Sequence, residues 1–115
     1  MDALDLLTTR RSVRELTEPA PDELELETVF QAATQVPDHG GLTPWRFVVI
    51  QGDEAKARFR RALEETVVQM KLGDESMKKT EKVANFAPMV IAVISKIAVG
   101  AEKPKPEWEQ FLSAG

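Results

Sequence analysis

Three arginines lie close together near the start of the sequence. Arg10, Arg11 and Arg14 fall within five residues of chain, and Ser12 lies between them. A guanidinium group offers a planar set of N–H donors that matches phosphate oxygens, and a serine hydroxyl adds a neutral donor. Such a cluster suits a monophosphate. Taken alone, a cluster of this kind is more often a solvated turn that pairs with nearby carboxylates, here Glu15 or Glu18.

The second candidate is a loop, residues 37–45, which carries the only histidine of the chain, His39. Its two glycines and two prolines impose a path that regular structure could not follow, and the glycines let the backbone approach a flat ligand closely. Taken alone, the simpler interpretation is a loop histidine with a local partner such as Asp38. Trp45 is expected to pack against the following strand. One histidine without cysteine cannot complete a typical zinc site, so no metal is predicted.

The remaining polar residues predict no further site. The paired carboxylates at 64–65 and 74–75 are best explained as helix faces and caps. Ser113 has no nucleophile motif around it, and the sequence contains neither a phosphate-binding P-loop nor a GxGxxG motif after a strand. No catalytic side chain is predicted.

Capping signals predict the helices beside these two segments. Asp2 caps a short helix that runs to about Thr9, directly before the arginine cluster. Asp22 followed by Glu25 forms a capping-box start, and Pro37 ends this second helix because proline disfavours the α region in the residue before it. The apolar face of the second helix consists of Leu26, Val29, Phe30, Ala33 and Val36.

A buried strand and a third helix are expected after the histidine loop. The run Phe47 to Ile50 predicts the strand, which ends at Gly52. Asp53 is expected to cap the third helix, and Gly73 is expected to end it.

A second strand is expected toward the end of the chain. A shorter helix from Asp74 to about Ala84 precedes it, and Met89 to Ser95 is apolar on both faces, which predicts a central strand. Lysines and prolines follow at 103–106, and a last helical pattern begins near Trp108. This order predicts an α+β sandwich of helices around a central sheet. Two strands alone are marginal, so further strands must come from additional sequence or another chain.

Composition narrows the functional classes. The chain has 115 residues, which fits one domain, with 43% apolar and 30% charged residues. A net charge of −4 argues against nucleic-acid binding, which needs a basic face. The longest apolar run, 89–94, is too short to span a membrane, and no signal peptide is recognised. The absence of cysteine excludes disulfides and thiolate sites. We expect a cytoplasmic location.

The two candidate segments occur in an order that resembles the N-terminal region of the FMN-dependent nitroreductase family. The resemblance consists of Arg-Arg-Ser-x-Arg after a short helix, then a capped helix, then Pro-Asp-His-x-x-x-x-Pro-Trp-x-Phe-x-Val. It is strongest to the minimal, YdjA-like subgroup, through Met1-Asp2-Ala3-Leu4, Glu18-Pro19-Ala20-Pro21 and Trp108-Glu109-Gln110 before Ser113-Ala114-Gly115. The resemblance covers essentially the whole chain, and family chains continue well past residue 115. It implies that residues 1–115 are the N-terminal portion of a single nitroreductase-like domain.

The resemblance implies a cofactor, a partner and a reaction. Family members bind FMN noncovalently at a homodimer interface. Arg10, Arg11 and Ser12 match the segment that holds the FMN phosphate and ribityl chain, and Arg14 is a weaker candidate near the same group. His39 matches a position that reaches the FMN, held mainly by the partner subunit. The family transfers hydride from NAD(P)H through FMN to nitroaromatic or quinone-like acceptors. The alternative is a truncated, noncatalytic module that binds flavin or phosphate, or only dimerises.

Overall fold

The computed structural model describes residues 1–97 and 106–115, which form five helices and two strands. In chain order these elements are α1 (Ala3–Thr9), α2 (Glu23–Ala33), β1 (Trp45–Gln51), α3 (Asp53–Gln69), α4 (Asp74–Asn85), β2 (Met89–Ser95) and α5 (Glu107–Ala114). The order and type of every element match the sequence expectation, and the bounds of β2 match it as well. The predicted Lys-Pro segment lies outside the described residues except for Pro106.

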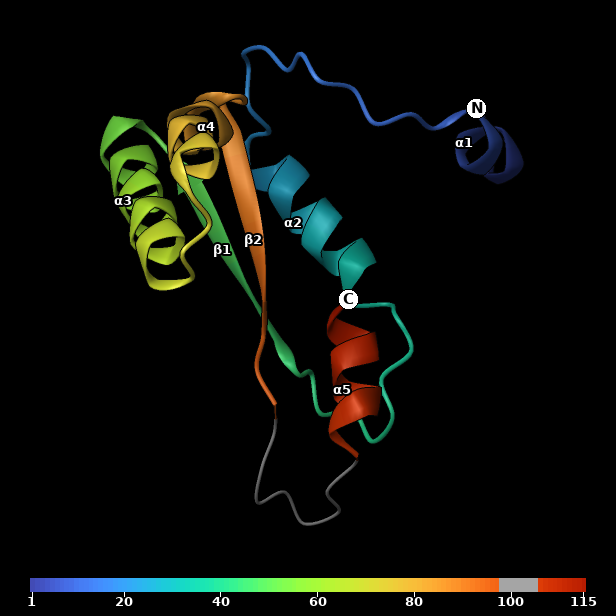
Figure 1. Ribbon diagram of the computed structural model, residues 1–115. Coiled ribbons are helices and arrows are strands. Elements are labelled where there is room, and N and C mark those ends of the chain that lie inside the picture. Colours follow the sequence, from blue (N-terminus) through green and yellow to red (C-terminus); the bar gives the residue numbers. More distant parts are fainter. Residues whose placement is uncertain (98–105) are drawn as a thin grey trace.

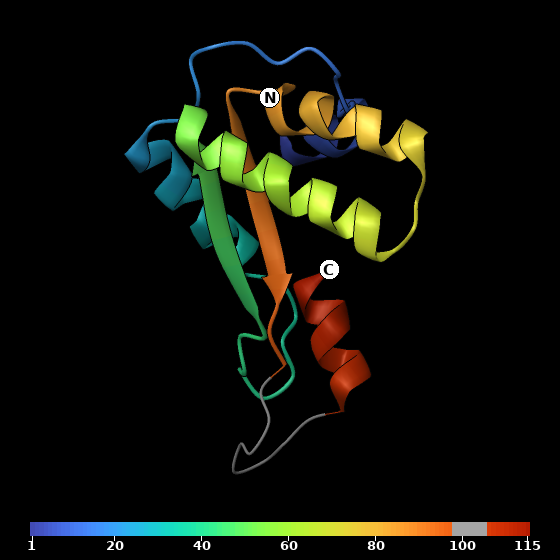
Figure 2. The same cartoon turned by 60° about the vertical axis from the view of Figure 1, so that its left-hand side comes forward.

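The two strands form an antiparallel sheet with helices on both sides. Trp45 of β1 lies opposite Ser95 of β2, and Gln51 lies opposite Met89 at the other end. Helices α3 and α4 lie on one side of the sheet and α2 lies on the other (Figures 1 and 2). On the α2 side, the rings of Phe30 and Phe47 stack with their centroids 4.7 Å apart. The predicted α+β arrangement of helices around a sheet is confirmed.

Strand β2 does not have the central position that its apolar sequence predicts. Within residues 1–97 and 106–115 it pairs with β1 alone, so one of its edges has no strand beside it. The side chains of Val93 and Ile94 are 52% and 46% exposed. An apolar strand with a free edge is a template for pairing with more chain. The further strands predicted from the sequence are not among the described residues, so they would have to come from additional sequence or from another subunit.

The N-terminal caps form largely as the sequence predicts. The Asp2 carboxylate accepts from the backbone N–H of Asp5 at 2.8 Å. Asp22 and Glu25 form a reciprocal capping box. Helix α2, however, ends at Ala33, well before Pro37, so Val36 lies outside the helix. The proline restricts only the residue before it, whereas the carbonyls of the last turn are closed earlier by backbone bonds from Thr34 and Gln35.

Both predicted ends of α3 were wrong in detail. Gly52, with φ of 86°, is the N-cap and provides no side-chain cap, while Asp53 is already the first helical residue. At the other end, Leu72 N–H donates to Val67 O and Lys71 N–H to Val68 O, which is a Schellman closure. Lys71 therefore occupies the left-handed position, with φ of 52°, that glycine usually takes. Gly73 instead precedes α4 as its N-cap.

The described core is small, and its residues come from β1, α3, α4 and the segments that flank them. Its buried apolar side chains are Pro44, Trp45, Ile50, Val67, Ala84 and Ala87. Helix α3 packs on both α4 and β1, and α5 lies against β2. Helix α1 has no buried residue.

The chain exposes more surface than a compact domain of its length. Its radius of gyration is 17.1 Å, against about 13 Å for a compact chain of this size. Its accessible surface is 9397 Å², whereas a compact monomer of this mass exposes about 6,300 Å². Part of the difference comes from the N-terminal arm, residues 1–19, which extends away from the sheet (Figure 1) and is exposed throughout. The excess of roughly 3,000 Å² is similar to the surface area that an obligate protein–protein interface buries.

Candidate functional site

The arginine cluster lies on the N-terminal arm, directly after α1. Arg10 closes the helix, since its backbone N–H donates to Leu6 O at 3.1 Å. The chain then leaves helical conformation, and residues 10–14 are all exposed. The Nη1 of Arg10 donates to the Ser12 hydroxyl at 3.3 Å. The guanidinium and the hydroxyl thus lie side by side, as two groups would that share one anionic ligand.

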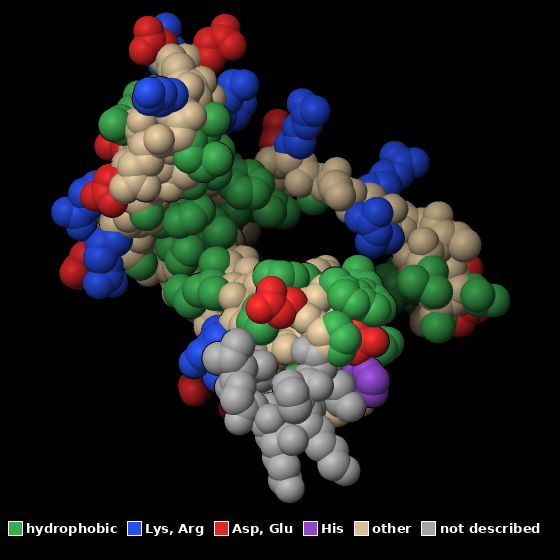
Figure 3. All heavy atoms as spheres, turned by 60° about the horizontal axis from the view of Figure 1, so that its bottom comes forward, with side chains coloured by type: hydrophobic (Ala, Val, Ile, Leu, Met, Phe, Trp, Pro, Cys, Tyr) green, Lys and Arg blue, Asp and Glu red, His purple; other side chains and the backbone are tan. Residues whose placement is uncertain are grey.

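The carboxylates near this cluster do not neutralise it. Glu18 instead accepts from the backbone N–H of Ala20 at 3.1 Å. In the part of the chain that the structure describes, none of the three arginines forms an ion pair with Glu15 or Glu18. The self-paired turn is therefore not formed, and the positive charge of the arm faces solvent. Figure 3 shows the basic side chains projecting from the arm, which stands apart from the body of the molecule.

The histidine loop is built around Asp38. Its carboxylate accepts from the backbone N–H of Thr43 at 2.7 Å, and its carbonyl accepts from Gly41 at 3.1 Å. Gly40 and Gly41 have φ of 83° and 62°, values that residues with a Cβ rarely adopt. The two glycines therefore let the loop turn tightly around the Asp38 carboxylate, and His39 projects from this turn.

The loop joins the core at its far end. Pro44 is fully buried, and its carbonyl accepts from the backbone N–H of Lys96 at 2.8 Å, just past the end of β2. Trp45 is 7% exposed, so its side chain is buried in the fold. It is the first residue of β1, so the strand begins two residues earlier than predicted. Burial at 44–45 gives the histidine loop a rigid base.

The partner of His39 is Glu109, on α5, rather than the neighbouring Asp38. His39 Nδ1 lies 2.6 Å from Glu109 Oε2. The simpler interpretation, a local partner such as Asp38, does not hold: the Asp38 carboxylate accepts instead from the backbone N–H of Thr43. A second contact joins the same two segments, in which Ser113 Oγ donates to Pro37 O at 2.7 Å. The loop and the last described helix therefore form one unit.

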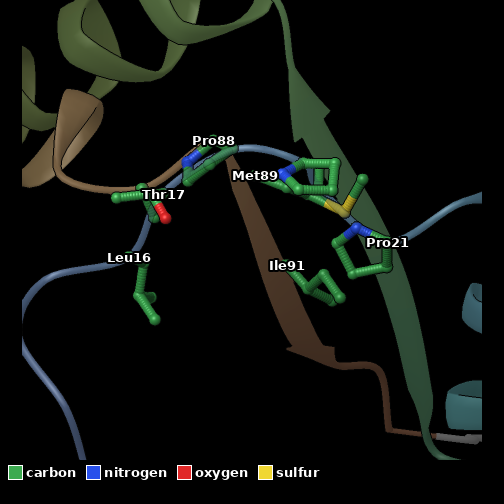
Figure 4. A pocket seen from close by; sticks show the side chains of 9 residues that line it. Leu16, Thr17, Pro21, Pro88, Met89 and Ile91 are labelled. Atoms are coloured by element: carbon green, nitrogen blue, oxygen red, sulfur yellow. The ribbon is translucent and has the colours of Figure 1, made fainter.

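A largely apolar cavity of about 400 Å³ lies beside the His39–Glu109 pair. Its lining also includes Val36, Pro37, Leu112, Ser113 and Gly115. A second apolar hollow, of about 260 Å³, lies where the arm meets the start of β2. Figure 4 shows Leu16 and Thr17 of the arm on one side of it, with Pro21, Met89 and Ile91 on the other. The second hollow contains none of the predicted site residues.

The two predicted segments do not meet within one chain. The arm carrying Arg10, Arg11 and Ser12 lies at the opposite end of the molecule from the loop at 37–45 and α5, in both Figure 1 and Figure 2. A single pocket that contains the arginines and His39 would therefore have to combine two copies of the chain.

Sequence reasoning did not find Glu109 and Ser113. They lie 70 and 76 residues from their loop partners, and no spacing rule joins such positions. Their one signal is that they are four residues apart, which places them on the same face of a helix. That face could be predicted, but its partner could not.

No group of three or more His, Asp or Glu residues within 1–97 and 106–115 could hold a metal ion. The longest helix of that part, α3, has 17 residues, and no helix there has the length and apolar content to cross a membrane.

Comparison with known proteins gives matches along nearly the whole chain. Residues 7–115 match the model of the nitroreductase family. A Haemophilus influenzae protein named "Putative NAD(P)H nitroreductase" is 48% identical over all 115 residues. The Escherichia coli protein "Putative NAD(P)H nitroreductase YdjA" is 38% identical over the same length. A solved nitroreductase-like family protein from Bacillus cereus superposes on 99% of this chain with a TM-score of 0.67 at 19% identity, which is a likeness of fold.

The matches also show how much of a relative this chain represents. It spans 61% of the length of both bacterial relatives and 60% of the Bacillus cereus structure. These relatives therefore carry sequence with no counterpart among the 115 residues. The free edge of β2 and the surface excess are consistent with a fold whose remaining parts come from such sequence.

Proposed function

Since the chain belongs to the nitroreductase family, we propose that it is the N-terminal portion of an FMN-dependent NAD(P)H oxidoreductase. Its acceptors would be nitroaromatic or quinone-like compounds. Residues 1–115 would form part of one domain, and FMN would lie at the interface of a homodimer. Arg10, Arg11, Ser12 and His39 would hold the FMN.

The observation that carries this proposal is the state of the Arg10–Ser12 segment. Arg10 Nη1 and Ser12 Oγ are 3.3 Å apart and exposed, and no carboxylate of the described chain pairs with the arginines. A phosphomonoester carries close to two negative charges at neutral pH and three acceptor oxygens. The free donors of Arg10, Arg11 and Ser12 fit that group in both charge and hydrogen-bonding type.

The position of His39 supports a shared site between two copies. Its imidazole lies at a largely apolar cavity of about 400 Å³, a volume within the usual range for a small-molecule pocket. The arginine segment lies at the far end of the same chain (Figure 1), on an arm that buries nothing. An arm that reaches a second copy would bring its arginines near that copy's own loop and would bury apolar residues such as Leu4 and Leu7.

The chain's own residues would bind and orient. FMN, when bound, would supply the two-electron transfer from NAD(P)H to the acceptor. The arginine segment would neutralise the phosphate, and the apolar lining of the cavity beside His39 would contact the bound ligand. No acid–base pair or nucleophile is needed from this chain for such a role, and we assign no catalytic residue.

The test is flavin retention and turnover by the 115-residue protein. Purified protein should be yellow, or should become so with added FMN, and should release flavin absorbance on denaturation. NADH or NADPH oxidation is then followed with and without a nitroaromatic acceptor. Protein that stays colourless and fails to take up FMN would contradict the proposal.

Flavin binding without turnover would instead favour the noncatalytic module. The same assay repeated with the chain extended to the length of its relatives separates two causes of such a result. Turnover only in the extended chain would place the missing catalytic requirements beyond residue 115. No turnover in either chain would reject the oxidoreductase assignment.

A further inference from the structure

The contact between His39 and Glu109 joins two segments that are 70 residues apart in the sequence. His39 Nδ1 lies 2.6 Å from Glu109 Oε2, a distance typical of a charge-assisted hydrogen bond. The His39 side chain is 61% exposed, whereas that of Glu109 is 26% exposed. The imidazole is therefore largely open to solvent, whereas its carboxylate partner is mostly covered, and both residues line the cavity.

The geometry of α5 explains why the two atoms meet. Glu109 and Ser113 are four residues apart and lie on one face of α5. Ser113 donates to the carbonyl of Pro37, two residues before the histidine. The backbone of the loop is thus held by Ser113, and its imidazole is held by Glu109.

We propose that Glu109 is a positioning residue that determines which nitrogen of His39 faces the ligand. An ionised carboxylate can only accept hydrogen bonds, so the imidazole nitrogen facing it must carry the proton. That nitrogen is Nδ1. The hydrogen bond at one ring nitrogen sets the role of the other. Nε2 is therefore the nitrogen presented to a ligand, as an acceptor in neutral His39 and as a donor in the cation.

This role is distinct from holding the fold together. An ion pair with one partner this exposed contributes little to stability, because water screens it. The Ser113–Pro37 contact already joins α5 to the loop. What Glu109 adds is control over the ring, since a free loop histidine could turn or change tautomer.

The inference deepens the proposed function and rests on it in one respect, namely that the ligand at Nε2 is the flavin cofactor. Both His39 and Glu109 line the cavity beside the pair. Its apolar lining suits a flat aromatic ligand, for which one ring nitrogen would provide the polar contact. The choice of tautomer, however, can be measured without any ligand.

The test uses the single histidine of the chain. Imidazole ¹⁵N shifts of His39 are recorded by NMR in the free 115-residue protein at about pH 9, above the usual imidazole range. We expect Nδ1 to carry the proton and Nε2 to be unprotonated. Glu109→Ala should lose this preference, and Glu109→Gln should weaken it, because the glutamine amide can either accept from Nδ1–H or donate to an unprotonated Nδ1.

Ser113→Ala is the matched control. It removes the Ser113–Pro37 hydrogen bond between α5 and the loop without changing the group that faces the ring. The Nδ1–H form should persist in this variant. Wild-type protein with the proton on Nε2 would overturn the inference. So would a tautomer change in Ser113→Ala as large as that in Glu109→Ala, because Glu109 would then act only by tethering the helix. Far-UV circular dichroism of each variant establishes that the helices remain formed.

FMN titration of the same variants tests the ligand-facing part. Glu109→Ala should weaken FMN binding about tenfold, the scale for one well-oriented hydrogen bond, and Glu109→Gln should give an intermediate affinity. Equal affinities in wild-type and Glu109→Ala protein would overturn this part. Failure of the wild-type protein to bind FMN would reject the proposed function. The tautomer measurement would still test the role of Glu109, because it needs no ligand.

Discussion

The arm at residues 1–19 and the loop at 37–45 both carry predicted ligand-binding residues, yet they are held in opposite ways. The arm has a capped helix and a local Arg10–Ser12 contact, and no residue in it is buried. The loop is fastened internally by Asp38, at its base by Trp45, and from outside by Glu109. Figure 1 shows the same difference, since the arm stands apart while the loop lies against α5.

The difference shows how the two parts of the proposed cofactor site are held. The histidine loop is organised before any ligand or partner arrives, so little ordering cost remains for it on binding. The arm keeps its charges solvated and its leucines exposed, so its order must come from a partner surface or ligand. Substitutions in the loop should therefore act on stability, and substitutions in the arm should act on binding.

The largest expected effect is on stability, from Trp45→Ala. The side chain is 7% exposed at the base of the loop, and removing a buried tryptophan costs about 3–5 kcal/mol of unfolding free energy. Urea denaturation followed by circular dichroism measures this loss. Leu7→Ala on the arm, at a side chain 75% exposed, is the control and should change stability by less than about 0.5 kcal/mol.

If Trp45→Ala abolishes folding, Trp45→Phe provides an intermediate point. The unfolding free energies should then rank wild type above Trp45→Phe and Trp45→Phe above Trp45→Ala. Losses of similar size from Trp45→Phe and Leu7→Ala would remove the contrast between loop and arm.

The next effect is on cofactor affinity, from Arg10→Ala. The substitution removes a charged donor beside Ser12, and a hydrogen bond to a charged group is worth about 1.5–3 kcal/mol. FMN affinity, measured by fluorescence titration, should fall about tenfold to a hundredfold while stability stays unchanged. Arg61→Ala on the exposed surface of α3 is the matched control. Unchanged flavin affinity in Arg10→Ala would show that the cluster is only a solvated turn.

The smallest effect is expected from Asp38→Ala. The Asp38 carboxylate accepts from Thr43 N–H at 2.7 Å in a half-buried position. Its loss should lower the unfolding free energy by about 1 kcal/mol, within the usual range for one hydrogen bond. Asp38→Asn keeps an acceptor in place and should lose less. If the loop were held only by its buried end at residues 44–45, urea denaturation would give the same unfolding free energy for the two variants.

Much of the architecture could be predicted because its signals are local. The Asp2 cap and the Asp22–Glu25 capping box need only residues three apart, and both form. Strand β2 follows directly from an unbroken apolar run. The ends of α3 were mispredicted because glycine at 52 and lysine at 71 both take positive φ, and the order of a sequence does not reveal which residue will accept that conformation.

The candidate site shows the same difference between local features, which the sequence predicts, and long-range contacts, which it does not. The sequence by itself determined the arginine segment, the single histidine and the family to which the order of the two belongs. Only the tertiary structure decided that His39 pairs with Glu109 instead of Asp38, and that the arginines and the histidine lie apart within one chain. The physical reason is range, since caps and charge clusters depend on neighbours along the chain, whereas the 70-residue separation of His39 and Glu109 is bridged only when α5 packs beside β2.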